Sequence, residues 1–232
     1  MTNSTDGSAD LPIIFALPKG RLANDVAPLM RKVGLTPEPA FFDDQDRRLR
    51  FKTANPSVDL IPVKPFDVAT FVAHGGAQLG IVGADVLFEF RYSEVYSPVD
   101  LGIGNCRLSL AGEPHTIASH ALDDISHIKV ATKYPNVTKA YFAKKGIQAE
   151  CIKLNGSIEL GPKLGMCARI VDIVTTGNTL KANGLVEEAI LHHATSRLIV
   201  NRAALKTNGH QMRKWIDAFR KALKDDVKES QS

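Results

Sequence analysis

Short apolar runs alternate along the chain with stretches whose apolar residues recur every three or four positions. Residues 11–18 form the first apolar run, and the stretch that follows it places Leu22, Val26 and Leu29 at helical spacing. The same alternation continues, with predicted strands at 48–53, 57–63, 79–83, 127–132, 149–154, 168–174 and 195–205 and predicted helices at 64–76, 84–90, 137–146, 155–165 and 180–184. This alternation predicts an α/β fold with parallel sheets and right-handed crossovers.

One segment interrupts the alternation. Residues 99–126 contain turn residues and extended stretches in place of the strand and helix rhythm. We expect this segment to connect two lobes, the first formed by residues 11–102 with 193–232 and the second by residues 103–192. The polar residues 1–10 are expected to be a disordered tail.

The last helical stretch has a clear apolar face. Residues 210–227 place Met212, Trp215, Phe219 and Leu223 on one side of a helix. The favoured interpretation is a helix that packs on the protein's own core, and a helix that binds a partner is the alternative.

Composition and charge narrow the class of protein only slightly. Of the 232 residues, 23% are charged, and the net charge of +4 is too small to indicate nucleic-acid binding. No apolar run approaches the length that spans a bilayer, and the first ten residues lack the pattern of a signal peptide. Three cysteines, an odd number without close spacing, indicate a reducing compartment. We therefore expect a cytoplasmic protein without a membrane segment or a nucleic-acid partner.

The predicted strand 168–174 carries one acid, Asp172, and ends in a polar turn. This turn offers hydroxyls, an amide and a glycine that permits close approach: Thr175, Thr176, Gly177, Asn178 and Thr179. Backbone N–H groups at the start of the next helix favour an anion at the same place. A carboxylate just upstream would repel phosphate but could accept hydrogen bonds from a sugar diol. The pattern therefore indicates a sugar phosphate, with a helix-capping turn as the alternative.

A basic turn follows the first predicted strand. Lys19 and Arg21 flank Gly20, and two cations at the carboxyl edge of a sheet suit a polyphosphate. A solvated basic turn is the alternative. Arg47 lies in the charged stretch 43–50, for which a solvated hairpin is the default interpretation and a polyphosphate contact the alternative.

Two further turns carry acids. Asp85 follows the predicted strand 79–83 and could hold the ribose of a nucleotide, although an isolated acid there is more often a helix start. Gly156 turns the chain before Ser157 and Glu159. Taken alone, these residues favour a capping device, with Ser157 as the N-cap and Glu159 in the first helical turn, over a binding site.

These segments, in this order, resemble the ATP phosphoribosyltransferase family. The stretch 159–180, ELGPKLGMCARIVDIVTTGNTL, is similar to the family signature, with its glutamate, Asp172 and the final Thr-Gly-Asn-Thr at the family's spacing. Further blocks that resemble the family are LPKGRL, KPFDVATFV, GIVGADVL, ATKYPN and LNGSIE. The common type-one phosphoribosyltransferases carry two adjacent acids before the threonines, whereas Val171 stands at the first position here. Cys167 also replaces a smaller residue of the family, and the resemblance covers residues 11–205.

The resemblance implies a fold and a reaction. The fold is two α/β lobes with a central cleft, similar to type II periplasmic binding proteins. In the reaction, N1 of ATP displaces pyrophosphate from phosphoribosyl diphosphate, which is the first step of histidine biosynthesis. Mg²⁺ would be held largely by substrate oxygens rather than by a protein cage. This agrees with the sequence, because His192 and His193 lack the companions that a metal site needs.

For the site, the resemblance implies that residues 175–179 hold the 5-phosphate and that Asp172 binds the ribose hydroxyls. Gly156, Ser157 and Glu159 would line the same pocket. Two basic residues, Lys19 and Arg21, would face the polyphosphates and stabilise the departing pyrophosphate, with Arg31 and Arg47 as weaker candidates. One acid, Asp85, would help to seat ATP.

The resemblance also implies partners. The long form of the family has an additional C-terminal regulatory domain that binds histidine, and the end of this chain soon after Trp215 leads us to expect the short, catalytic form. That form is expected to be a homodimer and to join a regulatory subunit that resembles histidyl-tRNA synthetase in a hetero-oligomer. The alternatives are a solute-binding module of the same fold, which binds small anions without catalysis, and a non-catalytic regulatory relative.

Overall fold

The computed structural model describes residues 11–229, and the tail expected at residues 1–10 lies outside them. The described chain forms two compact units. The first comprises residues 11–82, 92–103 and the chain from 196 onward, and the second comprises 83–91 and 104–195. The predicted lobes, 11–102 with 193–232 and 103–192, assign the segment 83–91 to the first lobe, whereas the structure groups it with the second unit.

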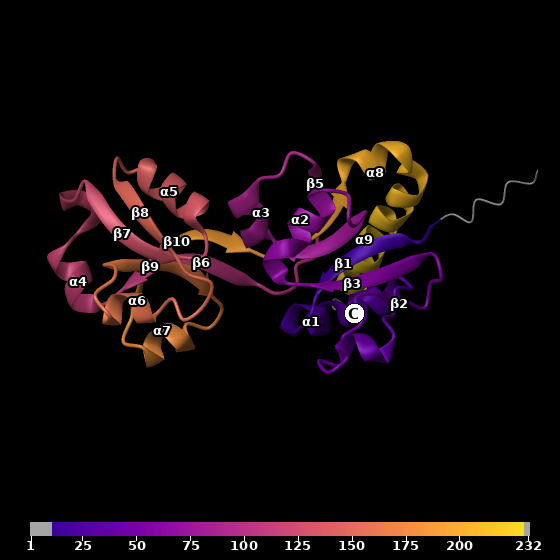
Figure 1. Ribbon diagram of the computed structural model, residues 1–232, viewed down its shortest axis with the longest axis horizontal. Helices are drawn as coiled ribbons and strands as arrows, with labels where there is room; N and C mark the ends of the chain where they lie inside the picture. Colours follow the sequence, from indigo (N-terminus) through magenta and orange to yellow (C-terminus); the bar gives the residue numbers. More distant parts are fainter. Residues whose placement is uncertain (1–10, 230–232) are drawn as a thin grey trace, which may run out of the picture. The chain divides into compact units, whose positions relative to one another are not determined.

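The first unit is built on a six-stranded sheet (Figure 1). Its order is β2 (Phe51–Lys52), β3 (Val58–Val63), β1 (Ile13–Pro18), β4 (Leu79–Gly83), β11 (Ser196–Asn201) and β5 (Val95–Asp100). Strand β1 runs parallel to β3 and β4. The edge strands β2 and β5 run antiparallel to their neighbours, so the sheet is mixed rather than purely parallel.

Helices cover both faces of this sheet. Its helical elements are α1 (Arg21–Lys32), η1 (Pro39–Phe42), η2 (Pro65–Asp67), α2 (Val68–Ala73), α8 (Arg202–Thr207) and α9 (Gly209–Glu229). On one face, the ring of Phe15 in β1 stacks on Phe219 of α9 with 6.2 Å between centroids. On the other face α2 lies so close to β4 that a Cβ at Gly80 would be 3.0 Å from Val68 Cγ1. The apolar side of α9, including Met212 and Trp215, is buried in the core of its own unit, which confirms the favoured interpretation of the last helix.

The second unit contains a five-stranded sheet. Its order is β10 (Val186–Ala194), β6 (Cys106–Gly112), β9 (Arg169–Val174), β7 (His127–Thr132) and β8 (Gln148–Lys153). Around it lie α3 (Ala84–Phe90), α4 (Pro114–Ser119), η3 (Leu122–Asp124), α5 (Pro135–Ala143), α6 (Leu160–Lys163) and α7 (Asn178–Ala182) (Figure 1). Strand β7 runs parallel to β8 and β9, so the carboxyl ends of these three strands share one edge of the sheet.

Two strands of this sheet differ from the prediction. The segment 99–126 contains β6, which pairs antiparallel with β9 and with β10 and is therefore part of the sheet rather than a simple connection between lobes. Strand β10 was not predicted, because most of its nine residues are exposed or half-buried and show no regular apolar alternation. Among the described residues, no helix has the length and apolar character needed to cross a membrane.

Asn201 connects three elements of the first unit. It is 5% exposed, and its Oδ1 accepts a hydrogen bond from Ala204 N at 2.8 Å, which caps the start of α8. Its Nδ2 donates to the carbonyl oxygen of Val72 at 2.7 Å, near the end of α2. One amide therefore satisfies backbone groups at the ends of two helices that water cannot reach.

We predict that Asn201→Ala lowers the free energy of unfolding of the first unit by about 2 kcal/mol, since a cap and a buried acceptor both lose their partner. Urea denaturation followed by the fluorescence of Trp215, the single tryptophan, measures this because Trp215 lies in the same core. Asn24→Ala is the matched control: Asn24 is exposed within α1 of the same unit. Equal effects of the two substitutions would contradict the prediction.

Candidate functional site

The predicted sugar-phosphate residues gather at the carboxyl edge of the second sheet. Strands β7, β8 and β9 end there, and the chain continues from them at residues 133, 154 and 175. Ligands of open α/β sheets bind outside the carboxyl ends of the strands, where such loops meet. The edge therefore brings Asp172 and the loop 175–179 to the same border as the turn that contains Gly156 and Ser157.

The loop 175–179 has the conformation that an anion site needs. Gly177 has φ +81°, a left-handed value that a side chain would strain, and α7 begins directly after it. The side chains of Thr175, Thr176, Asn178 and Thr179 are exposed, so their hydroxyl and amide groups can reach a ligand. Arg107 Nη1 donates to the carbonyl oxygen of Thr175 at 3.3 Å, which places a cation beside the loop that the sequence did not reveal.

Asp172 is half-buried on β9. Burial raises the pKa of its carboxyl; the charges of Glu159 and Asp85 raise it further, whereas the Ile173 backbone N–H and Lys133 oppose the change. Across the sheet Asp172 pairs with Ser109 of β6, whose buried Oγ has no hydrogen-bond partner among the described residues. Asp172 is thus a carboxylate with few partners in the protein, as expected of a residue that receives a ligand's hydroxyls.

The turn 155–159 is not a capping device. Helix α6 begins only at Leu160, and the residue in the N-cap position, Glu159, makes no side-chain capping bond. Ser157 instead adopts φ +50°, a strained value for a residue with a side chain. The capping interpretation of Ser157 is therefore wrong. Gly156 and Ser157 are exposed at the sheet edge, and the charge of Glu159 acts on Asp172.

Asp85 lies in the second unit and is 6% exposed. Its Oδ2 accepts a hydrogen bond of 2.7 Å from the hydroxyl of Tyr134, which follows β7. Burial is the main cause that raises the pKa of Asp85, while the Tyr134 hydroxyl lowers it. The sequence did not predict this pair, because nothing in the separate segments containing Asp85 and Tyr134 indicates that they meet.

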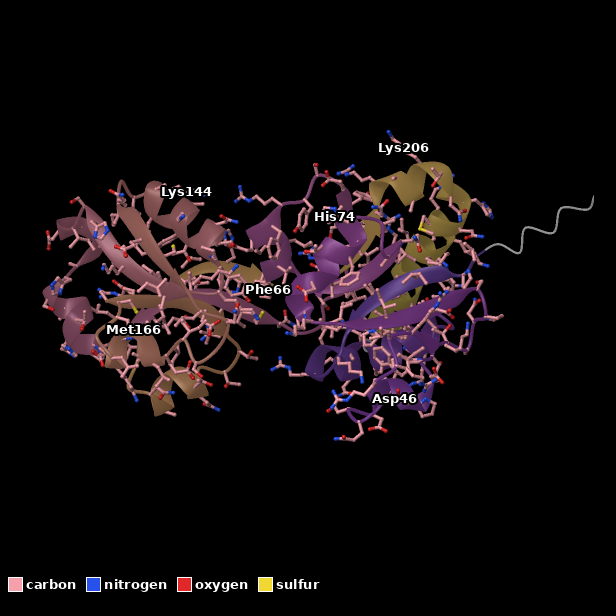
Figure 2. All side chains as sticks on the ribbon, in the orientation of Figure 1. Asp46, Phe66, His74, Lys144, Met166 and Lys206 are labelled. Carbon is pink, nitrogen blue, oxygen red and sulfur yellow. The ribbon has the colours of Figure 1, made fainter. Side chains whose placement is uncertain are left out.

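The basic residues predicted to face polyphosphate lie in the first unit. Lys19 follows β1; its Nζ donates to the carbonyl oxygen of Asp43 at 2.9 Å and lies 5.6 Å from the centroid of the Phe51 ring. Arg48 lies over the same ring at 4.8 Å and forms an ion pair with Asp46 at 2.9 Å. Arg48 and Asp46 lie on the loop that joins η1 to β2, where Figure 2 labels Asp46.

The other predicted cations are spread around this turn. Arg21 is the exposed first residue of α1 and lies 3.5 Å from Asp25, one helical turn later. Arg47 is exposed on the loop next to Arg48. Arg31 lies in the last turn of α1, ten residues after Arg21 and hence about 15 Å along the helix, so the structure does not bring it to the tip of β1.

No protein-built metal site accompanies these residues. Within residues 11–229, no group of three or more His, Cys, Asp or Glu side chains is placed to hold a metal ion. The charges of Glu159 and Asp85 act on Asp172, and the Asp85 carboxylate accepts the Tyr134 hydroxyl.

The fold consists of two α/β units and resembles that of binding proteins. In one unit, an acid on a strand is followed by a loop rich in glycine and threonine, a combination typical of the phosphoribosyltransferase class. A family model described as HisG, ATP phosphoribosyltransferase, matches residues 64–221. The chain belongs to the ATP phosphoribosyltransferase family, and it is a transferase of that family.

Known proteins support this assignment. The ATP phosphoribosyltransferase of Paramagnetospirillum magneticum is 59% identical over 213 residues, which cover 90% of this chain and 96% of the relative. That of Rhodospirillum rubrum is 53% identical over 220 residues, or 95% of this chain and 96% of the relative. The ATP phosphoribosyl transferase (HisG:HisZ) complex from Thermotoga maritima is similar in structure, with a TM-score of 0.74 and 29% identity over 92% of this chain and 99% of that one.

A fourth protein shows the fold alone. The substrate binding protein of an amino acid ABC transporter has a TM-score of 0.56 and 14% identity, over 94% of this chain and 93% of that one. The expected type II periplasmic-binding-protein-like fold is confirmed.

We predict that Asp172→Asn stabilises the free protein at pH 7. Asp172 binds its proton more tightly in the folded protein than in the unfolded chain, because its pKa is raised above 3.8. Above about pH 4 the ionised Asp172 carboxyl therefore lowers the free energy of unfolding. At lower pH it has no effect, because the carboxyl is protonated in both the folded and the unfolded chain. Melting temperatures should rise by about 2–4 °C at pH 7, the shift that ~1 kcal/mol gives in a protein of this size, and the gain should fade toward pH 3.8.

Asp123→Asn, a substitution of an exposed acid in the same unit, is the control and should leave the melting temperature nearly unchanged. A stabilisation by Asp172→Asn that stays constant with pH, or that Asp123→Asn reproduces, would exclude burial of the charge as the cause.

Proposed function

We propose that this chain transfers the 5-phosphoribosyl group of phosphoribosyl diphosphate to N1 of ATP and releases pyrophosphate, as the first step of histidine biosynthesis. The observation that carries the proposal is the 59% identity to an ATP phosphoribosyltransferase over 213 residues. The loop 175–179 and Asp172 fall within this match and have the groups that a ribose phosphate requires.

The 5-phosphate binds in the loop 175–179. Three threonine hydroxyls, the Asn178 amide and the backbone N–H groups around Gly177 supply donors at one place. Arg107, whose guanidinium also forms an ion pair with Glu187 at 2.8 Å, holds the backbone of this loop through its bond to the Thr175 carbonyl oxygen. Gly156 and the strained Ser157 line the same pocket. The left-handed backbone of Ser157 supports this role, because proteins retain a costly backbone conformation mainly where it serves a ligand.

Asp172 orients the ribose, and Glu159 lines the same pocket. A carboxylate beside the phosphate position accepts hydrogen bonds from the two ring hydroxyls. These bonds fix the orientation of the ribose ring, and with it the direction in which the anomeric carbon faces. The half-buried position of Asp172 strengthens these bonds, since they form in a medium of lower dielectric than water. Positioning of this kind lowers the barrier without a covalent intermediate.

Transfer breaks one bond and forms another. The lone pair of adenine N1 forms the bond to the anomeric carbon, and the electron pair of the broken C–O bond leaves with pyrophosphate. Positive charge builds on the ribose during this exchange and passes to the adenine, whose exocyclic amino group then releases a proton to water. Lys19 and Arg21, with Arg47 as a weaker candidate, stabilise the departing pyrophosphate.

Magnesium accompanies the substrates. The ion would be held largely by phosphate oxygens of phosphoribosyl diphosphate and ATP rather than by protein side chains, because Mg²⁺ is usually bound by few protein ligands. When bound, the ion neutralises part of the charge on the leaving group. The scattered acids of the described chain fit this arrangement better than a dedicated cage.

Partners and location complete the proposal. The structural neighbour from Thermotoga maritima is a HisG:HisZ complex, which supports a hetero-oligomer with a regulatory subunit that resembles histidyl-tRNA synthetase. We further propose that the catalytic chain is a homodimer of the short form. A cytoplasmic location agrees with the three cysteines, none of which forms a disulfide.

One assay tests the function. The protein is mixed with ATP, phosphoribosyl diphosphate and Mg²⁺, and the ultraviolet absorbance of an N1-substituted adenine is followed. A rise that needs all three components supports the transferase. Binding of phosphoribosyl diphosphate in calorimetry without any rise, also after addition of a regulatory subunit, would support the solute-binding alternative.

We predict that Thr179→Val raises the KM for phosphoribosyl diphosphate about tenfold, the effect of one lost hydrogen bond to a charged group (~1.5 kcal/mol), and changes the KM for ATP less than twofold. Thr207→Val removes a similarly exposed hydroxyl in the first unit and should change neither value. Equal increases in both KM values for Thr179→Val would show that the loop does not hold the 5-phosphate.

A further inference from the structure

Asp85 is a buried carboxylate that a buried tyrosine holds by a hydrogen bond. Asp85 is 6% exposed and Tyr134 is 1% exposed, and the phenol donates to Asp85 Oδ2 at 2.7 Å. Burying an acid is costly unless its charge is compensated, so a buried, hydrogen-bonded carboxylate indicates a use for that charge or for its position.

Gly83 makes room for this carboxylate. Its φ of −66° and ψ of 142° suit any residue, so the backbone does not require glycine here. A Cβ at Gly83 would instead collide with Asp85 Oδ1 and lie 3.2 Å from Asp85 Cγ. The absence of a side chain at Gly83 is therefore what allows the Asp85 carboxylate to fold back toward the end of β4.

Two buried threonines fix the tyrosine. Thr132 Oγ1 accepts from Tyr134 N at 2.9 Å, and Thr138 Oγ1 donates to Tyr134 O at 2.8 Å. Both threonines have no exposed surface. These bonds fix the backbone of Tyr134 at the end of β7, and its buried phenol reaches Asp85 from that fixed position.

The charge of Asp85 acts on the predicted ribose site. Asp85 is one of the groups that raise the pKa of Asp172, and the charges of both acids raise the pKa of Tyr134. Thr132, two residues before Tyr134, pairs with Val171, the neighbour of Asp172, and its Oγ1 donates to the Val171 carbonyl oxygen at 2.7 Å. The pair of Tyr134 and Asp85 therefore lies at the strand end that carries Asp172. Burial reduces the screening of the Asp85 charge by water.

We propose that the Asp85 carboxylate, held by Gly83 and Tyr134, is a fixed negative charge that stabilises the positive charge developing on the ribose as pyrophosphate leaves. Tyr134 is then a positioning residue that acts through Asp85. This inference rests on the proposed function and replaces the expected role of Asp85 in seating ATP. A charge that is already in place when the transition state forms needs no reorganisation, which is the condition for effective electrostatic catalysis.

Asp85→Asn tests the charge, because asparagine keeps an oxygen that can accept the Tyr134 hydroxyl. We expect kcat to fall about 100- to 1,000-fold, the range that the loss of one preorganised electrostatic group costs. KM for phosphoribosyl diphosphate should stay the same or decrease, since a negative charge near a polyanion is removed. KM for ATP should not change.

Gly83→Ala and Tyr134→Phe test the geometry while keeping the acid. The first displaces the Asp85 carboxylate, and the second removes its hydrogen-bond donor. Both should lower kcat by smaller factors than Asp85→Asn. Because the Tyr134 hydroxyl lowers the pKa of Asp85, its removal should move the acidic fall of kcat to higher pH, whereas Asp85→Asn should lack this component.

The pH profile must be interpreted against neighbouring groups. The titratable residues that interact with Asp85 or Tyr134 in the second unit are Lys133, Asp172 and Cys106, and Glu159 acts on Asp172. These groups are unchanged in every variant, so a difference between the profiles of the wild type and Tyr134→Phe belongs to the altered pair.

Glu89→Gln is the matched control. Glu89 is 4% exposed in the same helix, α3, and it also contacts the segment after β7, where its carboxylate accepts from Asn136 N and Val137 N at 3.0 Å. It is not among the groups that shift the pKa of Asp172. Glu89→Gln should change melting temperature as much as Asp85→Asn or more, with kcat within about threefold of the wild type.

The outcomes separate the two proposals. A wild-type protein without transferase activity overturns the proposed function. An active wild type with kcat lost in Asp85→Asn but not in Glu89→Gln supports the inference. An increase in KM for ATP at unchanged kcat, equal losses in both variants, or no loss in Asp85→Asn would overturn it.

Discussion

The site depends on the cost of keeping carboxylates away from water at the end of a sheet. Asp172 is half-buried on β9, and Asp85 is almost fully buried beside the end of β7. Burial raises the pKa of both carboxyls, the charge of Asp85 raises that of Asp172 further, and the Tyr134 hydroxyl opposes the change at Asp85. A protein retains such an arrangement where a ligand or a reaction supplies the missing positive charge.

Parallel strands explain why distant segments contribute to one site. The ends of β7, β8 and β9 bring residues 133–134, 154–159 and 175–179 to the same border, although up to 46 positions separate them in the sequence. Each segment supplies one component: a buried phenol, a strained turn and a hydroxyl-rich loop. The backbone hydrogen bonds of the sheet fix the spacing between these components, and the loops carry the chemistry.

The sequence predicted the α/β class, most strands and the loop 175–179, because each depends on local patterns of apolar residues, glycine and hydroxyls. It did not predict β5, β10 or the place of β6, whose pairing depends on partners far along the chain. The capping interpretation of Ser157 was wrong because a left-handed serine has no local signature. The contacts of Tyr134 with Asp85 and of Arg107 with Thr175 join segments at least 49 positions apart, and single-segment patterns carry no information about such pairs.

The second unit is not one continuous piece of chain. Nine of its residues, 83–91, are inserted from the sequence of the first unit, and they bring both Asp85 and Glu89. A fragment produced as residues 104–195 alone would thus expose the phenol of Tyr134 and leave the first backbone N–H groups of α5 without their carboxylate. The smallest version of this unit that folds alone needs α3 joined back onto it. Gene fusions or circular permutants should place their new ends where they do not separate α3 from residues 104–195.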